Sequence, residues 1–248
     1  MTPPLTSEIS SFSSCILSIT VLVKTTSSVD AFDNGFSVLM SDTKERIIST
    51  AVELFNEKGF VSVTMRDLAN ELDMSLGNLT YHFKKKEELM EAIHDRIIEE
   101  RNVMLESVQM IPSIENIHRQ MVPLLQLYER YRFLQQDILE VSRAYPHLAE
   151  IMRGQFKNQI RYIKAIIDYS VGSGNMKAEV RLGQYQQLAE TVWMIITFWL
   201  AQRELRDQKG NLYNQARSAI WNLTIPLLTE KGLANFNKID FNEEVLTN

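Results

Sequence analysis

The sequence predicts an all-α fold, and three observations carry that prediction. Apolar residues recur at spacings of three and four along most of the chain, which is the period of a helix buried on one face. Proline and glycine are few, at six and nine of 248 residues, which favours helices over a strand-and-turn architecture. No repeat and no segment of alternating apolar and polar residues is visible. A core of packed helices is therefore expected.

Residues 1–39 differ from the rest of the chain. They are rich in serine and threonine and hold one basic residue, Lys24. Their apolar run, residues 15–23, is too short to span a bilayer, and no basic segment precedes it as in a signal peptide. Met40 is followed by Ser41 and Thr43, either of which can cap a helix. The hypothesis is that translation begins at Met40, which would make the first 39 residues an artefact; a disordered extension over 1–40 is the alternative.

The first amphipathic helix is predicted over residues 41–58. Its apolar stripe consists of Ile47, Ile48, Ala51, Leu54 and Phe55, and Gly59 is expected to end it. A helix with one apolar face needs a partner to cover that face. We expect it to brace the segment that follows.

Residues 64–86 follow a helix-turn-helix pattern. Thr64 can cap a first short helix, with Asp67 as the acidic partner of a capping box. Ser75 can cap a second helix over residues 76–83. The residues expected to be buried are Leu68, Ala69 and Leu72 in the first helix and Leu76, Leu79 and Phe83 in the second.

The outer face of the second helix has the chemistry of a DNA-reading surface. Gly77 allows close approach, and Asn78 can both donate to and accept from a base edge in the major groove. Tyr81 and His82 can donate to phosphate oxygens, and residues 84–86 add three lysines. An ordinary helical hairpin whose lysines face solvent is the alternative.

These residues also carry a family resemblance. The first helix holds A-x-x-L-F-x-x-x-G-F, followed by the spacing of Thr64, Leu68 and Ala69, then by Gly-Asn-Leu, Tyr-His-Phe and Lys-Glu-Glu-Leu. Residues 43–93 thereby resemble, without a gap, the N-terminal domain of the TetR family of bacterial transcriptional regulators. Two positions depart from the family pattern. Asp73 stands where glycine is usual in the turn, and Thr80 stands where an aromatic residue is common.

The resemblance implies a domain organisation and a set of DNA contacts. It implies a three-helix DNA-binding domain over residues 41–101, a helical ligand-binding and dimerisation domain over 102–234, and leaves a loose tail over 235–248. The implied function is a ligand-responsive repressor that binds double-stranded operator DNA of palindromic sequence as a homodimer. The predicted DNA-contacting residues are Thr64, Arg66, Leu76, Gly77, Asn78, Thr80, Tyr81, His82, Lys84 and Lys86.

The charge of the chain is unusual for a DNA-binding protein. The formal net charge is −5, and residues 41–93 carry seven Lys/Arg against ten Asp/Glu. Placement therefore matters more than the total, because the acidic residues precede the second helix or follow Lys86. We expect modest non-specific DNA affinity with a steep salt dependence. The single Cys15 excludes an intramolecular disulfide and a cysteine-based zinc site, which suits the reducing cytoplasm where we expect the protein.

The second half of the chain is predicted to be a series of longer helices. A helix from Lys86 to about residue 109 is expected to link the two domains, and to end at Pro112. Pro123 is expected to kink the helix that follows. The further predicted helices cover residues 113–128, 131–144, 146–169, 182–206 and 211–228, and the acidic tail after Leu233 is expected to be loose.

Residues 192–200 are apolar almost all round a helix, yet too few to span a membrane. Such a helix must be covered on both sides, which favours a homodimer. The family resemblance implies that the last two long helices form the interface, with Trp199, Ile220 and Trp221 as interface residues. A buried helix in a monomer is the alternative. The aromatic residues Tyr128, Phe133, Tyr162 and Trp193 could line a pocket for a small-molecule effector, although they could equally form plain core. The sequence does not identify the effector.

A helical-bundle metalloenzyme is the alternative from another class of protein. Glu91-x-x-His94 and Glu115-x-x-His118 are two copies of the pair used by di-iron helix bundles. If the two helices form a hairpin near Pro112, the histidines differ in height by roughly 18 Å and cannot share a metal. No nucleophile-elbow sequence is present. We therefore predict no catalytic residue, no metal, no cofactor and no membrane association, and a regulator controlled by a protein partner remains the other alternative.

Overall fold

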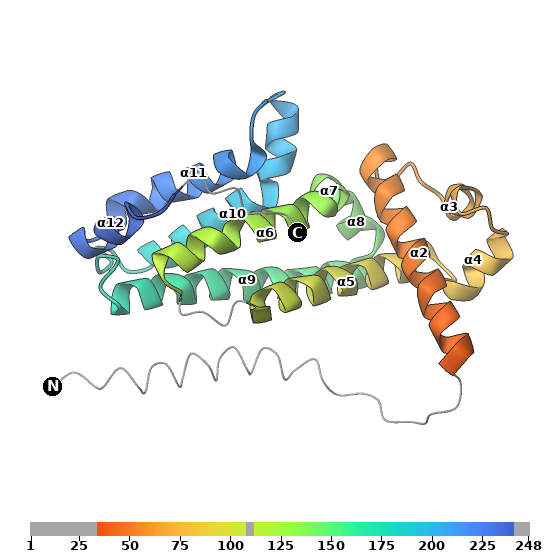
Figure 1. Ribbon diagram of the computed structural model, residues 1–248. Helices are drawn as coiled ribbons and strands as arrows, with labels where there is room; N and C mark the ends of the chain where they lie inside the picture. The colour runs from red at the N-terminus through yellow and green to blue at the C-terminus, as the bar shows by residue number, and fades with distance from the viewer. Residues whose placement is uncertain (1–33, 108–111, 241–248) are drawn as a thin grey trace. The chain divides into compact units, whose positions relative to one another are not determined.

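The computed structural model describes residues 34–107 and 112–240, with side chains for residues 42–104 and 112–240, and within these ranges it is built from helices without a named strand (Figure 1). The chain divides after Asp42, and the unit Thr43–Asn248 is compact. The helices are α2 (Asn34–Lys58), α3 (Met65–Glu71), α4 (Leu76–His82), α5 (Lys86–Ser107), α6 (Ile114–Arg130), α7 (Arg132–Gln136), α8 (Ile138–Ala144), α9 (Pro146–Gly172), α10 (Gln184–Leu205), α11 (Leu212–Thr224), the 3-10 turn η1 (Ile225–Leu227) and α12 (Glu230–Phe236). The all-α prediction is confirmed.

The first described helix begins earlier than predicted. α2 starts at Asn34, so neither Ser41 nor Thr43 caps it. The predicted extension over residues 1–40 lies outside the described residues up to residue 33. Farther along α2 the predicted apolar stripe is buried, with Ile47, Ala51 and Phe55 almost without exposed surface. The periodicity of the sequence therefore located the buried face of this helix, but not its start.

One hydrophobic core joins α2–α5 to the first part of residues 112–240, which we call the regulatory half after the domain predicted there. Phe55 of α2 lies with its ring centroid 5.5 Å from that of Phe60 and 5.1 Å from that of Phe133 in α7. The same core cluster continues into α8 and α9 through Val141 and Leu148. It therefore crosses the predicted boundary between residues 101 and 102. We call the part of this unit from residue 43 to residue 83 the reading head.

The segment predicted as one helix over residues 131–144 is two helices. The break falls at Asp137, whose backbone leaves the helical range at φ −102° and ψ 17°. Its carboxylate accepts a hydrogen bond from the backbone N–H of Phe60, 77 positions away, at 2.7 Å. A partner that distant is invisible to periodicity, so the sequence did not predict the break. α6 meanwhile runs through Pro123 to Arg130 as one helix.

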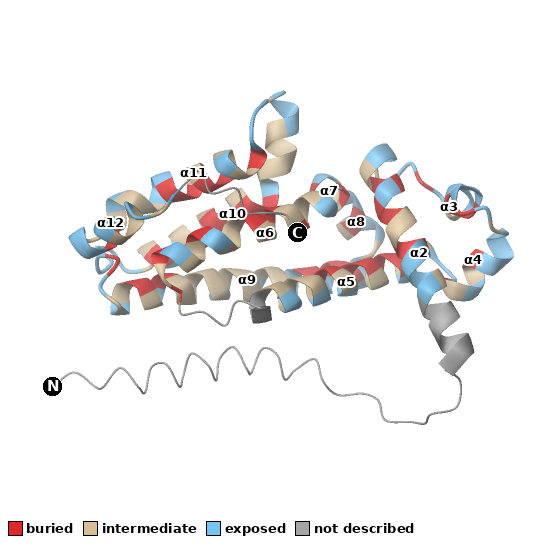
Figure 2. Cartoon of the chain, viewed as in Figure 1, coloured by how far each residue is buried: buried red, intermediate tan, exposed pale blue. Residues whose placement is uncertain are grey.

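The long helices pack lengthwise in the regulatory half (Figure 1). α9 packs on α10, α10 packs on α11, and α11 packs on α6. Figure 2 shows the buried residues on the inner sides of these helices. A second core cluster lies here and includes Ile114, Tyr185 and Trp221. No helix in the described part of the chain, α10 included, is long and apolar enough to cross a membrane.

The end of the described chain is packed rather than loose. The helix predicted over residues 211–228 ends at Thr224, before Pro226, and α12 follows from Glu230 to Phe236. The ring of Phe236 lies 4.9 Å from that of Trp221. A Cβ atom at Gly232 would stand 2.0 Å from the carbonyl oxygen of Asn175, so only glycine allows α12 this close. The predicted loose tail therefore does not begin at residue 235, and its residues 241–248 lie outside the description.

Candidate nucleic-acid interface

The first short helix of the predicted motif begins with a complete capping box. The hydroxyl of Thr64 accepts a hydrogen bond from the backbone N–H of Asp67 at 3.2 Å. The Asp67 carboxylate in turn accepts from the backbone N–H of Thr64 at 2.8 Å and from its hydroxyl at 2.6 Å. These bonds to Thr64 lower the pKa of Asp67. Because Thr64 is engaged in this way, its main role is to fix the start of α3.

The turn between the two helices has the predicted geometry. Asp73 adopts a left-handed backbone conformation at φ 51°, where the related family has glycine. The backbone N–H of Met74 donates to the carbonyl of Ala69 at 3.0 Å, which closes the end of α3. Ser75 then caps α4 by accepting from the backbone N–H of Asn78 at 3.1 Å. Local hydrogen bonds thus set the angle at which α4 leaves the turn.

α4 presents one buried and one exposed face. Leu79 is fully buried and anchors the helix to the core, together with Phe83 just beyond its end. Gly77 and Asn78 are exposed, the Tyr81 side chain is 67% exposed, and Leu76, which was expected to be buried, is 37% exposed. A short helix held by one face and carrying an amide and a phenol on the other can enter a major groove.

Nothing in the described part of the chain requires a glycine at position 77. Its backbone φ is not in the left-handed region, and an added Cβ would meet nothing nearer than the Ser75 hydroxyl at 3.9 Å. Glycine inside a helix costs up to about 1 kcal/mol relative to alanine. An approach from outside the protein, such as that of a DNA backbone or base edge, would account for it.

Two other predicted contacts are less free than expected. The hydroxyl of Thr80 donates to the carbonyls of Leu76 and Gly77, at 2.9 and 3.1 Å, so its hydrogen is used within α4. His82 is partly buried, its Nδ1 atom is shielded from solvent, and its ring packs edge-on against that of Tyr81 at 5.4 Å. Tyr81 and Asn78 are therefore the better candidates for direct contacts.

Lys86 was predicted to contact DNA, whereas in the structure its ammonium group is engaged within the chain. Its ammonium group donates to the carbonyls of Phe60 and Val63 and lies 3.8 Å from the centre of the Phe60 ring. Burial lowers the pKa of Lys86 to about 8. The ammonium group therefore joins two carbonyls of the segment between α2 and α3, and the rings of Phe55 and Phe60 lie beside it.

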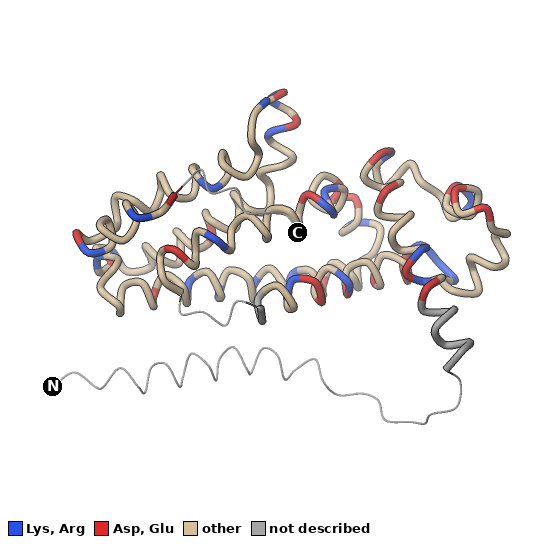
Figure 3. The backbone as a smooth tube through the Cα atoms, in the orientation of Figure 1, with Lys and Arg blue, Asp and Glu red and all other residues tan. Residues whose placement is uncertain are grey.

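The remaining cations of this region stand free for a polyanion. Arg66, Lys84 and Lys85 are exposed. Lys44 of α2, which the sequence did not single out, is also exposed, and its ammonium lies 6.0 Å from the Phe83 ring at the end of α4. Charges of both signs occur along this part of the chain in Figure 3. The candidate phosphate contacts among the exposed cations are thus Lys44, Arg66, Lys84 and Lys85, without Lys86.

Comparison with known protein families identifies the family to which this helix-turn-helix belongs. Residues 47–93 match the family model described as bacterial regulatory proteins, tetR family. Residues 82–236, more than half of the chain, match the TetR model described as bacterial transcriptional repressor. The chain belongs to the TetR family. It is a transcriptional regulator of that family, with a helix-turn-helix DNA-binding domain at its N-terminal end.

Individual relatives of this TetR-family chain agree with the assignment. A probable HTH-type transcriptional regulator of Bacillus subtilis, YttP, is 34% identical over 83 residues, which are 34% of this chain and 40% of the relative. A TetR-family regulator structure from Marinobacter aquaeolei superposes with a TM-score of 0.69 at 23% identity, covering 79% of this chain and 98% of that one. A regulator structure from Saccharomonospora viridis, in complex with choline, gives 0.63 at 18% identity, covering 77% and 100%. The structural matches establish the fold.

The four predicted pocket residues of this TetR-family chain do not all lie together. Phe133 is fully buried and packs on Phe55 in the core shared with the reading head, so it lines no pocket. Tyr128 and Trp193 instead meet around Gln159 of α9, to which Trp193 Nε1 donates at 3.1 Å. Tyr162 lies one turn beyond Gln159, and burial raises its pKa. Three of the four residues therefore stay candidates.

The three residues predicted to lie in the dimer interface differ in how far they are buried. Ile220 and Trp221 are buried within the single chain, at 3% and 4% exposed surface. Trp221 Nε1 donates to His118 Nδ1 at 3.2 Å, and its ring packs on Phe236. These two residues therefore cannot face a partner subunit, and that prediction is wrong. The outer face of α10 exposes Met194 and Phe198 instead, while Trp199 is partly buried.

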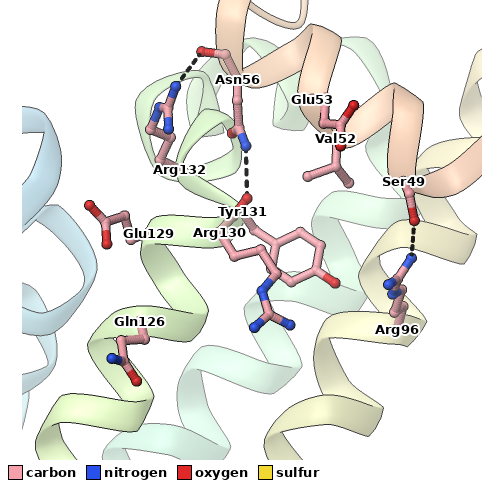
Figure 4. Close-up of a pocket in the computed structure, with 10 residues that line it drawn as sticks. All are labelled: Ser49, Val52, Glu53, Asn56, Arg96, Gln126, Glu129, Arg130, Tyr131 and Arg132. Carbon is pink, nitrogen blue, oxygen red and sulfur yellow. Dashed lines mark hydrogen bonds between the residues drawn. The ribbon is translucent and has the colours of Figure 1, made fainter. Parts of the chain in front are cut away.

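A polar cleft of about 430 Å³ lies between α2, α5 and α6, where the reading head meets the regulatory half (Figure 4). Its arginines have partners: Arg96 pairs with Glu45 and Glu100, at 3.2 and 3.1 Å, and Arg130 pairs with Glu100 at 2.8 Å. The residues that line it are Ser49, Val52, Glu53, Asn56, Arg96, Gln126, Glu129, Arg130, Tyr131 and Arg132. None of the predicted pocket residues is among them.

The histidines of the two Glu-x-x-His pairs are both buried within the chain. His118 accepts the bond from Trp221, and burial is the main cause that lowers its pKa to about 4. His94 is buried in α5, and burial likewise lowers its pKa. Among the described residues no three His, Cys, Asp or Glu side chains gather as metal ligands would.

Sequence reasoning missed one residue of the helix that connects the two predicted domains. Arg101 of α5 follows Ile93 and Ile97 at intervals of four, which places it on the face of the helix where those two are buried. A charged residue at a core-facing position is the signal that could have identified it.

Proposed function

We propose that this TetR-family regulator is a ligand-responsive repressor that binds a palindromic operator as a homodimer. The observation that carries the DNA contact is the exposed face of α4, where Gly77 has open space around it and Asn78 and Tyr81 reach outward. Base edges would be read by Asn78, with Gly77 allowing the approach. Arg66, Lys84, Lys85 and Lys44 would contact phosphates, which set position and affinity rather than sequence preference.

A dimer is supported by the apolar surface that α10 and α11 leave open. Met194 and Phe198 are 48% and 38% exposed and stand one turn apart on α10, and Leu223 on α11 is 40% exposed. Large exposed apolar side chains in register along a helix are typical of an interface. A two-fold dimer through these faces would present two copies of α4, and paired reading helices match a palindromic site.

Ligand response and repression rest on the comparisons. The model that matches residues 82–236 is described as a bacterial transcriptional repressor. The Saccharomonospora structure of the same fold is a complex with choline, which is a small molecule. A ligand that binds one arrangement of the two reading heads better than another would shift the DNA-binding equilibrium by its difference in affinity.

The test begins with selection of bound fragments from the genome of origin, which yields an operator sequence. Fluorescence anisotropy then compares operator with scrambled DNA for the wild type and for Asn78→Ala and Gly77→Ala. We expect Asn78→Ala to reduce the ratio of the two affinities by about tenfold or more. Gly77→Ala should weaken DNA binding while thermal stability is kept or raised, because nothing in the chain opposes the methyl group. An unchanged ratio in Asn78→Ala would refute the assignment of α4 as the reading helix.

A further inference from the structure

Arg101 of α5 carries a half-buried and largely unpaired positive charge. Its Nε and Nη1 atoms are shielded from solvent and have no hydrogen-bond partner in the described part of the chain. Only Nη2 has one, the side-chain oxygen of Gln155 in α9, at 3.3 Å. A guanidinium has five N–H donors and stays protonated in proteins, so most of its donors here lack an acceptor.

Arg96, five residues earlier on the same helix, shows the contrast. It is held by Glu45 at 3.2 Å, by Glu100 at 3.1 Å and by the Ser49 hydroxyl at 3.1 Å. No described carboxylate lies within ion-pair distance of Arg101, and the neighbouring Tyr128 phenol, whose pKa burial raises, is neutral near pH 7. Removing a guanidinium from water without a counter-charge costs several kcal/mol. The cost would be recovered if an anion entered.

The surroundings of Arg101 suit a particular kind of anion. Tyr128 bonds to Gln159, and Gln159 accepts from Trp193, whose ring lies 5.2 Å from that of Phe156. Tyr128 also packs against the apolar cluster of Val192, Ile196 and Ile220. Tyr128 thus lies beside the charge, and aromatic and aliphatic side chains continue from Tyr128 away from Arg101. A phosphate or sulfate would find too few donors here, whereas a carboxylate on an apolar body would match both parts.

We propose that Arg101 is the anion-binding residue of the effector site, and that the effector is an organic acid whose carboxylate pairs with Arg101 and whose apolar body packs beside Tyr128 and Trp193. This inference rests on the proposed ligand response and names its ligand class. It also gives a route to the DNA, because Arg101 lies on α5 and the first residue of α5 is Lys86, which binds the carbonyls of Phe60 and Val63 in the reading head.

The first experiment needs no ligand. Arg101→Met keeps the length of the side chain and removes the charge, so the free protein should melt about 2–6 °C higher than the wild type. Arg96→Met is the matched control on the same helix and should melt lower, because it removes the ion pairs to Glu45 and Glu100 and the hydrogen bond to the Ser49 hydroxyl. If Arg101→Met melts lower or fails to fold, the guanidinium has a partner in the native chain and the proposal is overturned.

The second experiment uses straight-chain alkanoates of six to twelve carbons as probes. We expect at least one of them to raise the melting temperature of the wild type and to change its tryptophan fluorescence, to which Trp193 contributes, while the matching primary amide and alkyltrimethylammonium ion do neither. Arg101→Met should lose the response and Arg101→Lys should keep part of it. If no alkanoate exceeds its amide counterpart, or if Arg101→Met responds as the wild type does, a carboxylate site at Arg101 is ruled out.

The DNA measurement separates this inference from the proposed function. Operator affinity of the wild type is measured with and without the alkanoate that binds. If the alkanoate binds only when Arg101 is present and also lowers the affinity for the operator, both the inference and the proposed function are supported. Sequence-specific DNA binding without any alkanoate response overturns the inference alone, whereas alkanoate binding without sequence-specific DNA binding overturns the proposed function and leaves the site standing.

Discussion

The Asp137 carboxylate accepts a hydrogen bond from the Phe60 backbone N–H at 2.7 Å, which ties the start of α8 to the segment that enters α3. The Asn56 side chain makes a second tie, donating to the Arg130 carbonyl at 2.8 Å and accepting from the Phe133 N–H at 3.0 Å. Both ties bypass α5. The regulatory half therefore holds the reading head at the end of α2 as well as through the connecting helix.

Asn56→Ala should destabilise the chain by about 1–3 kcal/mol, because it leaves a partly buried N–H and a carbonyl without their partner. Asp137→Asn should have a similar but smaller effect, because its amide oxygen can still accept. Urea unfolding measures both. The control is Asp168→Asn on α9, whose carboxylate pairs with Lys164 on the surface, and which should change stability by less than about 0.5 kcal/mol. Equal effects at residues 137 and 168 would contradict the role of the tie.

Lys86→Met should lower stability by about 1–3 kcal/mol and leave the salt dependence of DNA binding unchanged, because its ammonium serves two carbonyls of its own chain. Lys84→Ala should do the opposite, reducing the slope of log affinity against log salt by about one at unchanged stability. Lys157→Ala, an exposed lysine of α9, is the control and should alter neither. Anisotropy titrations at several salt concentrations measure these slopes. A reduced slope in Lys86→Met would show that Lys86 contacts a phosphate after all.

Met194→Glu and Phe198→Glu should each convert the proposed dimer into a folded monomer, since a carboxylate at the centre of an apolar interface loses its hydration without gaining a partner. Sedimentation velocity gives the assembly state, and circular dichroism shows that the helices are kept. Trp221→Ala is the contrast, because Trp221 is buried within one chain and its loss should cost about 3–5 kcal/mol of stability. Dimers that survive both glutamate substitutions would place the interface elsewhere.

His118 should make stability depend on pH. Its pKa is about 4 in the folded chain, where burial and Arg217 disfavour the charged form, against 6.5 for a free histidine. The folded state therefore binds fewer protons between these values, so the contribution of His118 is present above pH 6.5 and is lost as the pH falls toward 4. The loss amounts to at most about 3 kcal/mol.

His118→Gln is the variant that isolates this effect. Glutamine can still accept from Trp221 Nε1 but does not titrate, so the difference in unfolding free energy between pH 7 and pH 4.5 should be smaller than in the wild type. Urea titrations at the two pH values, followed by tryptophan fluorescence, provide the measurement. An identical pH dependence in both proteins would show that His118 keeps its ordinary pKa.

The features that the sequence predicted correctly are those fixed by neighbouring residues. The capping box of Thr64 and Asp67, the Ser75 cap and the left-handed Asp73 each involve residues within five positions of one another. The helix period likewise predicted the buried stripe of α2 and the anchor at Leu79. Because these interactions are local, the residue pattern alone was enough to identify the helix-turn-helix.

The errors concern residues whose partners are far away in the chain. Lys86 lies 23 positions from Val63, Phe133 lies 77 from Asn56, and Trp221 lies 103 from His118. Composition identified each as a basic or aromatic side chain, but whether such a group faces DNA, a partner subunit or the core depends on which segments meet.

The sequence by itself determined the reading motif and the helical period of the chain, since these follow from caps, turns and spacing, and it indicated the family through the resemblance of residues 43–93. Only the tertiary structure decided that Lys86 bonds to carbonyls of its own chain, that Trp221 belongs to the core, and that Arg101 has no counter-charge among the described residues. The physical reason is that burial and pairing are properties of packed surfaces, which distant segments create together.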